Sequence, residues 1–327
     1  MTKTTLYQNR LLSFLILFLL TSISTVLAHN NQASSNYKMS KDVLSNGGNQ
    51  ANSSNYQRLS TIGQPATRKL ISNNMVLQAG FHHPNGQAIS PATCQIYAVN
   101  DKGLNKSQFF TISLDELKVT KLGPLYKGHD IESLAIHPET NMIYAASGDN
   151  VTNGNQGHFY MVDGQTGELF PLCSTGFNEI EELAFDPEGT LWAWAKGDGL
   201  ITINPTTCAT TLELASDVLV EGLSLSKAPN RTLFYGSVNT ALWVYDMDAN
   251  TLDVACTNLF GETEALEMMP DGLMMPDGLL LVGTHNVPFG LHAFNPETCE
   301  VIMADETLTN KFKDVEGIAV PIEACSK

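Results

Sequence analysis

Five glutamates recur between residues 130 and 320, and each is followed two residues later by Leu or Ile. Spacings of 49, 40, 43 and 52 residues separate them: Glu132, Glu181, Glu221, Glu264 and Glu316. Carboxylate oxygens are the ligands that Ca²⁺ prefers in proteins. If the fold brings these side chains together, the group has the chemistry to bind such a cation, and we take all five as candidate metal ligands.

A period of 40 to 52 residues is typical of the four-stranded blades of a β-propeller. Each glutamate segment precedes a Gly, Pro or Asn turn and further short apolar segments, a pattern typical of antiparallel strands. Residues 95–123 supply only three such segments, and residues 314–320 supply only one. We therefore predict an all-β fold, a five-bladed β-propeller whose C-terminal strand closes the first blade. This closure removes two free sheet edges.

The first strand of a blade lines the central channel, so the predicted fold places the five glutamates at one mouth of that channel. The loops after the second strands open on the same face, and we expect their polar residues to form a ligand-binding rim: Asp101, Asp149, Asp198, Asn239 and His285. Five adjacent carboxylates repel one another. A bound cation, protonation, or hydrogen bonds from the backbone of the next blade would each relieve this repulsion, and the sequence leaves all three open.

The chain has a formal net charge of −16, and this charge is unevenly distributed. Residues 1–28 contribute +2, residues 29–90 contribute +4, and residues 91–327 contribute −22, which sum to −16. Nucleic-acid binding requires clustered Lys and Arg, so we exclude it. The expected partner of the acidic region is a cation, and the cofactor that we predict is Ca²⁺.

The first 90 residues contain two further segments. Residues 1–28 combine Arg10, the apolar stretch 11–20 and a small-residue cleavage pattern, as in a secretory signal peptide. Residues 29–90 form a predicted small β-repeat module and linker, with segments that begin at Asn36, Asn55 and Asn74. We therefore expect a secreted, periplasmic or cell-surface protein without transmembrane anchoring after signal cleavage.

Two stretches resemble families found in exported bacterial proteins. Residues 36–81, which end in Ala79-Gly80-Phe81, resemble a short repeat module of bacterial surface proteins. The strand pattern of Glu221-Gly222-Leu223-Ser224 and the turn Asp186-Pro187-Glu188-Gly189 resemble the first strand of phytase-like exported propellers. That resemblance implies calcium-dependent phosphoester hydrolysis. The chain departs from those relatives because it lacks the Lys and Arg clusters that would hold a polyphosphate, which argues against phytase activity.

Six cysteines are consistent with disulfides in an exported protein. Cys94 and Cys325 flank the composite blade, so we predict that they are bonded and secure the closure. The symmetry of the repeats suggests the pairs Cys173–Cys208 and Cys256–Cys299. Spacing alone leaves the connectivity open.

From these features we predict an exported, non-catalytic β-propeller that binds a small ligand or a protein and holds Ca²⁺ at its acidic mouth. We expect a monomer and nominate no catalytic residue. The alternative is a metal-dependent hydrolase, acting on phosphoester, lactone or glycosidic bonds at the same face. A propeller fold does not by itself decide between these functions.

Overall fold

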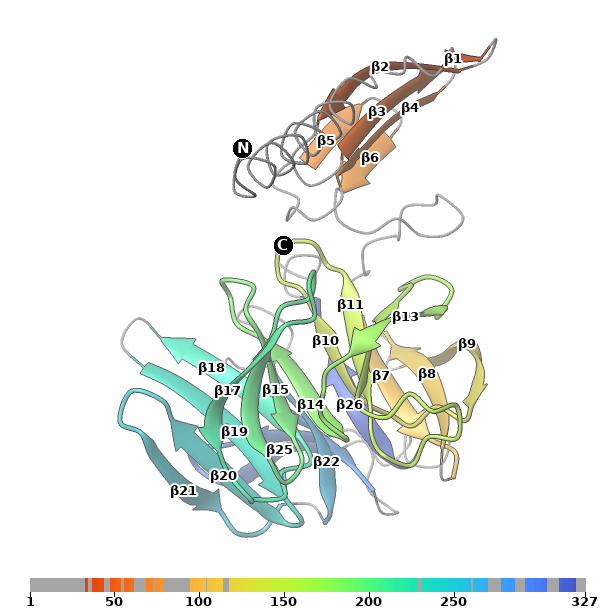
Figure 1. Ribbon diagram of the computed structural model, residues 1–327. Helices are drawn as coiled ribbons and strands as arrows, with labels where there is room; N and C mark the ends of the chain where they lie inside the picture. The colour runs from red at the N-terminus through yellow and green to blue at the C-terminus, as the bar shows by residue number, and fades with distance from the viewer. Residues whose placement is uncertain are drawn as a thin grey trace, which may run out of the picture. The chain divides into compact units, whose positions relative to one another are not determined.

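In the computed structural model the repeats form five four-stranded antiparallel sheets, each the blade of a propeller (Figure 1). The structure describes residues 95–103, 105–113, 118–228, 231–259, 261–269, 278–285, 292–304 and 312–321, together with the backbone of six strands within residues 33–78. The chain divides into two compact units, residues 1–82 and 83–327, and each is treated by itself.

The strands of blades 2 to 5 follow one another in sequence order, whereas blade 1 begins with the last strand of the chain. Blade 1 contains β26 (Val315–Ala319), β7 (Ile96–Asp101), β8 (Lys106–Ile112) and β9 (Val119–Lys127). Blade 2 contains β10 (Ile131–Ile136), β11 (Ile143–Ser147), β12 (His158–Val162) and β13 (Leu169–Ser174). Blade 3 contains β14 (Ile180–Phe185), β15 (Leu191–Ala195), β16 (Gly199–Ile203) and β17 (Thr210–Ala215). Blade 4 contains β18 (Leu223–Ala228), β19 (Arg231–Val238), β20 (Ala241–Asp246) and β21 (Thr251–Cys256), and blade 5 contains β22 (Thr263–Met268), β23 (Leu280–Thr284), β24 (His292–Asn295) and β25 (Glu300–Ala304).

The first strands of the blades contact one another in the closed cycle β26, β10, β14, β18, β22 and back to β26. Strand β26 pairs with β7, with Ile318 opposite Ala98, so the C-terminal strand joins the blade that the start of the domain leaves incomplete. The predicted five-bladed propeller and its mode of closure are therefore confirmed. No strand of the ring has to be supplied by another chain.

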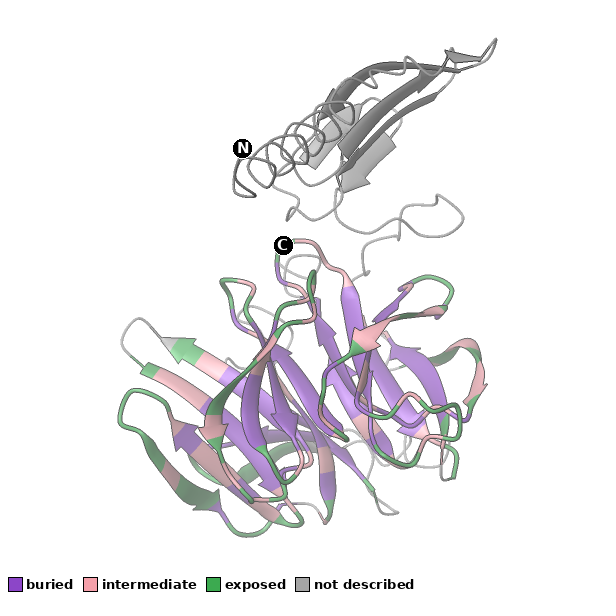
Figure 2. Ribbon diagram, in the orientation of Figure 1, coloured by how far each residue is buried: buried purple, intermediate pink, exposed green. Residues whose placement is uncertain are grey.

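The hydrophobic core consists of five clusters, and each lies between two neighbouring blades. Strand β7 illustrates the cause. Ile96 and Ala98 pack towards blade 5, while Tyr97 and Val99 pack towards blade 2, because successive side chains of a strand point to opposite faces. Figure 2 shows the inner strands buried and the outer strands more exposed. Trp192 and Trp194 lie buried between blades 3 and 4.

Two disulfides connect neighbouring blades near the outer edge. Cys173 at the end of β13 is bonded to Cys208 in the turn before β17, and Cys256 at the end of β21 is bonded to Cys299 before β25. The pairing that the repeat symmetry suggested is confirmed. The predicted bond between Cys94 and Cys325 lies outside the described residues.

In the N-terminal unit, β1 (Ala33–Ser34), β2 (Tyr37–Val43), β3 (Gly48–Ser53) and β4 (Tyr56–Thr61) form one sheet, and β5 (Lys69–Ser72) pairs with β6 (Met75–Gln78). Strands β2, β4 and β6 begin 19 residues apart, at the three repeat positions seen in the sequence. The predicted signal peptide lies outside the described residues. Among the residues that are described, no helix has the length and apolar character needed to cross a membrane.

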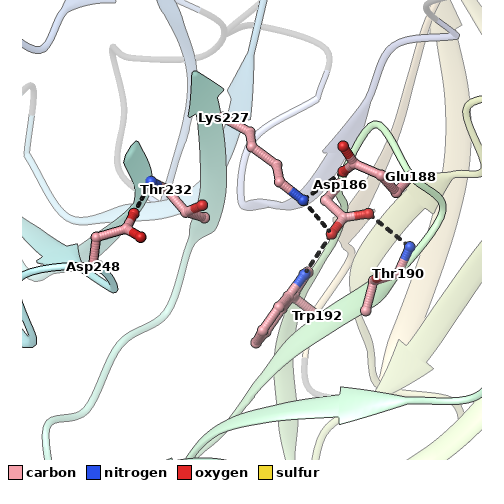
Figure 3. A network of polar contacts seen from close by, with 7 residues as sticks. All are labelled: Asp186, Glu188, Thr190, Trp192, Lys227, Thr232 and Asp248. Atoms are coloured by element: carbon pink, nitrogen blue, oxygen red, sulfur yellow. Dashed lines mark hydrogen bonds and ion pairs between the residues drawn. The ribbon is translucent and has the colours of Figure 1, made fainter. Parts of the chain in front are cut away.

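A polar network joins blades 3 and 4 through the turn that follows β14 (Figure 3). The buried Asp186 carboxylate accepts hydrogen bonds from Thr190 N–H at 2.8 Å and Trp192 Nε1–H at 3.4 Å. Lys227 of β18 lies 3.2 Å from the same carboxylate and also pairs with Glu188. Nearby, the exposed Asp248 accepts a hydrogen bond from Thr232 N–H at 2.8 Å.

Burial should separate the effects of these two aspartates on stability. We expect Asp186→Ala to lower the free energy of unfolding by about 2–4 kcal/mol, because it leaves the buried Trp192 Nε1–H without its acceptor and Lys227 with only the exposed Glu188 as partner. The matched control Asp248→Ala removes one exposed hydrogen bond and should cost about 0.5–1 kcal/mol. Urea unfolding measures both changes. Equal losses in the two variants would contradict an inter-blade role for Asp186.

Candidate functional site

Four of the five recurrent glutamates lie at a β-bulge at the start of the first strand. Ile131 pairs with Ser147 and Ser133 with Ala146, so the intervening Glu132 has no cross-strand partner. The same shift occurs around three further glutamates: Glu181, Glu264 and Glu316. A bulge redirects a side chain and bends the strand locally. The repeated bulges therefore give these glutamates an orientation that a regular strand would not.

The fifth glutamate, Glu221, corrects one prediction. The sequence placed it within a strand formed by residues 219–224, but β18 begins only at Leu223. Its N–H still donates to the Ser237 carbonyl at 2.9 Å, and Ser237 N–H donates to the Gly222 carbonyl at 2.9 Å. Gly222 N–H donates instead to the Ser237 hydroxyl at 2.7 Å. A side chain thus replaces one bond of the ladder, and the regular strand starts later.

A second set of acids lies two residues before the glutamates in four repeats: Asp130, Glu179, Glu262 and Asp314. Their backbone carbonyls accept N–H bonds of 2.7–3.2 Å from the residues at the ends of the second strands: Gly148, Lys196, His285 and Asp101. These bonds hold equivalent segments of four blades in the same register. The acidic mouth therefore contains two sets of acids, of which the sequence analysis recognised only one.

The residues at the ends of the second strands differ from blade to blade, and so do their effects on the facing glutamates. The Glu132 carboxylate lies directly against Gly148. A Cβ at this position would come within 2.2 Å of the carboxyl group, so only glycine leaves room for it. Lys196 and His285 instead pair with the glutamates of their own blades, Glu181 and Glu264. The five-fold pattern of glutamates thus acquires distinct local surroundings.

Burial and neighbouring negative charges shift the titration of the whole ring. Burial, opposed in part by Lys196, raises the pKa of Glu181 to about 8. Burial and the charges of Glu316, Asp314 and Glu221 raise the pKa of Glu264 to about 11. Burial also raises the pKa of Glu132 and of Glu316 well above the ordinary value, and that of Glu221 to a lesser extent. Glu181 and Glu264 therefore hold protons at neutral pH when no cation is present.

One half of the mouth contains an oxygen-rich group. Side-chain oxygens of Glu132, Glu179 and Glu181 lie within 4.8 Å of one another. Lys196 Nζ lies 3.0 Å from Glu179 and also contacts Glu181. Burial lowers the pKa of Lys196, but the two glutamates outweigh that effect and raise it overall, so the ammonium stays charged. Glu132 Oε2 is buried and makes no hydrogen bond within the described part of the chain.

The other half contains a mixed nitrogen and oxygen group. His285 Nδ1 lies 2.8 Å from Glu264 Oε1 and also contacts Asp314 Oδ1. Ligand atoms of these three residues lie within 4.8 Å of one another. The sequence nominated Glu264 and His285 but missed Asp314, because it follows no motif and is recognised only by its position two residues before Glu316.

Other acids, outside the set of five recurrent glutamates, make hydrogen bonds from blade to blade. The sequence had suggested such bonds as one way to relieve the repulsion among those five. Glu182 Oε1 accepts hydrogen bonds from Leu134 N–H of blade 2 at 3.3 Å and from Leu183 N–H at 3.2 Å. Glu267 Oε1 accepts Val320 N–H at 3.0 Å. Burial raises the pKa of both carboxyls, to about 8 for Glu267. The sequence feature that could have identified Glu182 and Glu267 is an acidic residue within a strand whose other residues are mostly apolar.

The structure places the predicted rim residues unequally. Asp101 is half-buried, burial raises its pKa, and its charge contributes to the raised pKa of Glu316. His285 lies against Glu264, as described above. Asp149, Asp198 and Asn239 are exposed. The charge of Asp149 contributes to the raised pKa of Asp130, and the Asn239 carbonyl accepts a hydrogen bond from Thr263 N–H at 3.0 Å, next to Glu264.

Comparison with protein-family models gives no match, and neither does comparison with curated proteins. Solved structures give distant similarities. A nidogen/laminin complex aligns with a TM-score of 0.49 and 10% identity over 71% of this chain and 99% of that chain. TolB from Acinetobacter baumannii gives 0.44 and 13% over 70% and 67%, and Kuenenia stuttgartiensis hydrazine synthase gives 0.36 and 16% over 54% and 48%. Similarity at this level is no basis for inferring a function.

The raised pKa values predict how stability depends on pH. Glu181 and Glu264 are protonated in the folded state at pH 7 but ionise near 4.5 when unfolded. The folded state therefore binds more protons, and each such carboxyl should lower stability by about 1.4 kcal/mol per pH unit between its unfolded and folded pKa values. In metal-free buffer we expect the urea midpoint to fall steadily from pH 5 to pH 8.

A substitution tests whether the ring causes that slope. Glu181→Gln should flatten the dependence by about one proton's contribution up to pH 8. Glu188→Gln should leave it unchanged, because the side chain of Glu188 is 63% exposed. If the wild-type midpoint were constant or rose with pH, the ring carboxyls would not be buried in their protonated form.

Proposed function

We propose that this chain is an exported, non-catalytic β-propeller binding protein that holds a hard divalent cation of the Ca²⁺ type at the acidic mouth of its channel. The observation that carries the proposal is the repeated β-bulge, which turns equivalent glutamates of four blades into similar positions. Bulges are common beside functional sites because they re-aim side chains. A structural role alone does not require the same acid at every bulge.

The oxygen-rich group supports Ca²⁺ in particular. Glu132, Glu179 and Glu181 supply up to six carboxylate oxygens, and Ca²⁺ takes six to eight oxygen ligands in flexible geometry, with waters completing the set. Lys196 already places one positive charge beside two of these acids. It would stabilise the mouth without metal, and an entering cation would displace its ammonium group or share the site with it.

Two disulfides support placement in an oxidising compartment, in agreement with the predicted signal peptide. This chemistry fits a secreted, periplasmic or cell-surface protein. A hydrolase would need a nucleophile or base aligned with the bound metal. Two histidines lie near this face: His129 Nδ1 lies 3.3 Å from the Lys127 carbonyl, and His285 is held between two acids. These contacts favour binding over hydrolysis.

Calorimetric titration of the purified full chain with CaCl₂ tests the proposal. We expect heat of binding, together with a rise in the melting temperature at millimolar Ca²⁺, because a ligand that binds only the folded state stabilises it. Glu132→Gln should weaken binding about 10-fold or more, since it removes a charged ligand without changing shape. Lys196→Met should strengthen binding and destabilise the metal-free protein, because the internal competitor is lost.

Glu188→Gln is the matched control for charge, since that exposed glutamate pairs with Lys227 and lies in the turn after β14, at the opposite end of the strand from the bulge. It should bind Ca²⁺ like the wild type. Neither heat nor stabilisation at millimolar Ca²⁺ would refute the proposal. The same preparations should be screened with ester, phosphoester and lactone substrates, with and without Ca²⁺. Turnover that Glu132→Gln abolishes would favour the hydrolase alternative instead.

A further inference from the structure

The mixed group in the acidic mouth is assembled from three separate segments that meet where the ring closes. Glu264 lies at the bulge of β22, His285 directly follows β23, and Asp314 directly precedes β26. Blade 5 therefore supplies two of the residues, and the closing strand of blade 1 supplies the third. We refer to Glu264, His285 and Asp314 as the closure triad.

The backbone around the closure triad is held by hydrogen bonds. His285 N–H donates to the Glu262 carbonyl at 3.0 Å, and Asp101 N–H donates to the Asp314 carbonyl at 2.9 Å. Asp314 also adopts φ of +60°, a backbone conformation that few non-glycine residues adopt. Strain of this kind persists where the surroundings hold the residue in place and is concentrated at functional sites. The backbone that carries these side chains is thus held in place.

Once the two carboxyls of the triad lose their protons, as metal binding requires, acceptors outnumber donors. The single nitrogen Nδ1 of His285 faces Glu264 Oε1 and Asp314 Oδ1, yet Nδ1 can carry only one proton. The second oxygen of Glu264 is buried and has no hydrogen-bond partner in the described residues. His285 Nδ1, Glu264 Oε1 and Asp314 Oδ1 thus lie close together, and each can donate a lone pair. A metal ion bound between them would be coordinated by all three.

The donor set determines which class of metal fits. Ca²⁺ and Mg²⁺ take oxygen ligands almost exclusively, whereas an imidazole with carboxylates suits Zn²⁺ and its first-row neighbours. Zn²⁺ is usually four-coordinate, and three protein ligands leave one position for water. The His285 side chain is 45% exposed, so solvent can reach the triad. The triad therefore differs in chemistry from the oxygen-rich group around Glu132.

We propose that the closure triad of Glu264, His285 and Asp314 is a binding site for Zn²⁺ or a similar first-row divalent ion, and that the bound ion fastens blade 5 to the strand that closes the ring. The site goes beyond the proposed Ca²⁺ function and does not depend on it, because the two use different halves of the mouth. Metal binding by residues on both sides of the closure stabilises the folded ring through mass action.

Titration of the chelator-treated full chain with Zn²⁺, followed by calorimetry and thermal unfolding, tests this proposal. We expect one Zn²⁺ site and a higher melting temperature. His285→Gln should weaken Zn²⁺ binding more than about 100-fold, because even loss of a residue that only orients a ligand costs 10–100-fold. Co²⁺ added in place of Zn²⁺ should give visible absorption bands of a four-coordinate site, and His285→Gln should abolish them.

Control variants separate this site from other metal binding. His137→Gln replaces a half-buried histidine that follows β10 at the other end of its strand, and should bind Zn²⁺ like the wild type. Lys196→Met should change Ca²⁺ binding while leaving Zn²⁺ binding unchanged. Absence of Zn²⁺ binding at 100-fold excess, or equal affinity in wild type and His285→Gln, would overturn the proposal. Zn²⁺ binding without Ca²⁺ binding would overturn only the proposed Ca²⁺ function.

Discussion

Pairing of β26 with β7 is the interaction on which the other features of the propeller depend. It brings residues more than 200 positions apart into one sheet, with Val315 opposite Asn100. Because each core cluster lies between two blades, no blade can bury its apolar residues unless both neighbours are present. Closure therefore completes the core between blades 5 and 1, and it brings Glu316 and Asp314 to the acidic mouth.

The same closure creates the main electrostatic difficulty of the fold. Repeated units arranged around an axis place equivalent residues together, so a glutamate in each unit becomes a ring of acids. The protein limits the repulsion in two ways. Raised pKa values keep several carboxyls protonated, and Lys196 supplies a charge to Glu179 and Glu181. A metal ion can take over both functions, because it displaces the protons of the carboxyls that it binds and competes with the ammonium group for the carboxylates.

The sequence was sufficient to predict the blades, because a repeated pattern of short apolar segments reflects a period that the fold shares. It also suggested the pairs Cys173–Cys208 and Cys256–Cys299, which occupy equivalent places in successive repeats. The bulges were beyond its reach, since a bulge is a property of register between two strands and leaves no residue signature here. The late start of β18 was also beyond its reach, because a serine hydroxyl takes one bond of the ladder there, and the sequence therefore predicted that Glu221 lies within a strand.

The roles of individual acids were harder to predict than their presence. Hydrogen bonds between blades were considered for the five glutamates, yet Glu182 and Glu267 make them: Glu182 accepts Leu134 N–H of blade 2, and Glu267 accepts Val320 N–H directly after β26. Asp314 was missed because its importance comes from the approach of His285, which lies in another blade. Such contacts depend on the three-dimensional arrangement of side chains and have no counterpart in spacing along the chain.

The chemistry of the acidic mouth differs between blades at one position of the repeat, the residue that follows the second strand. The glutamate is constant in all five units, but the residue at the end of the second strand is Gly148 in blade 2, Lys196 in blade 3 and His285 in blade 5. A five-fold set of identical ligands would offer equivalent positions around the axis. Because the residue after the second strand differs between blades, the ring has two unlike halves. One half is rich in carboxylate oxygens and contains the Lys196 ammonium, and the other contains the His285 imidazole. Because this position follows the strand and does not lie within it, it can vary without disturbing the sheet, so the chemistry of the mouth can differ between blades while their structure is kept.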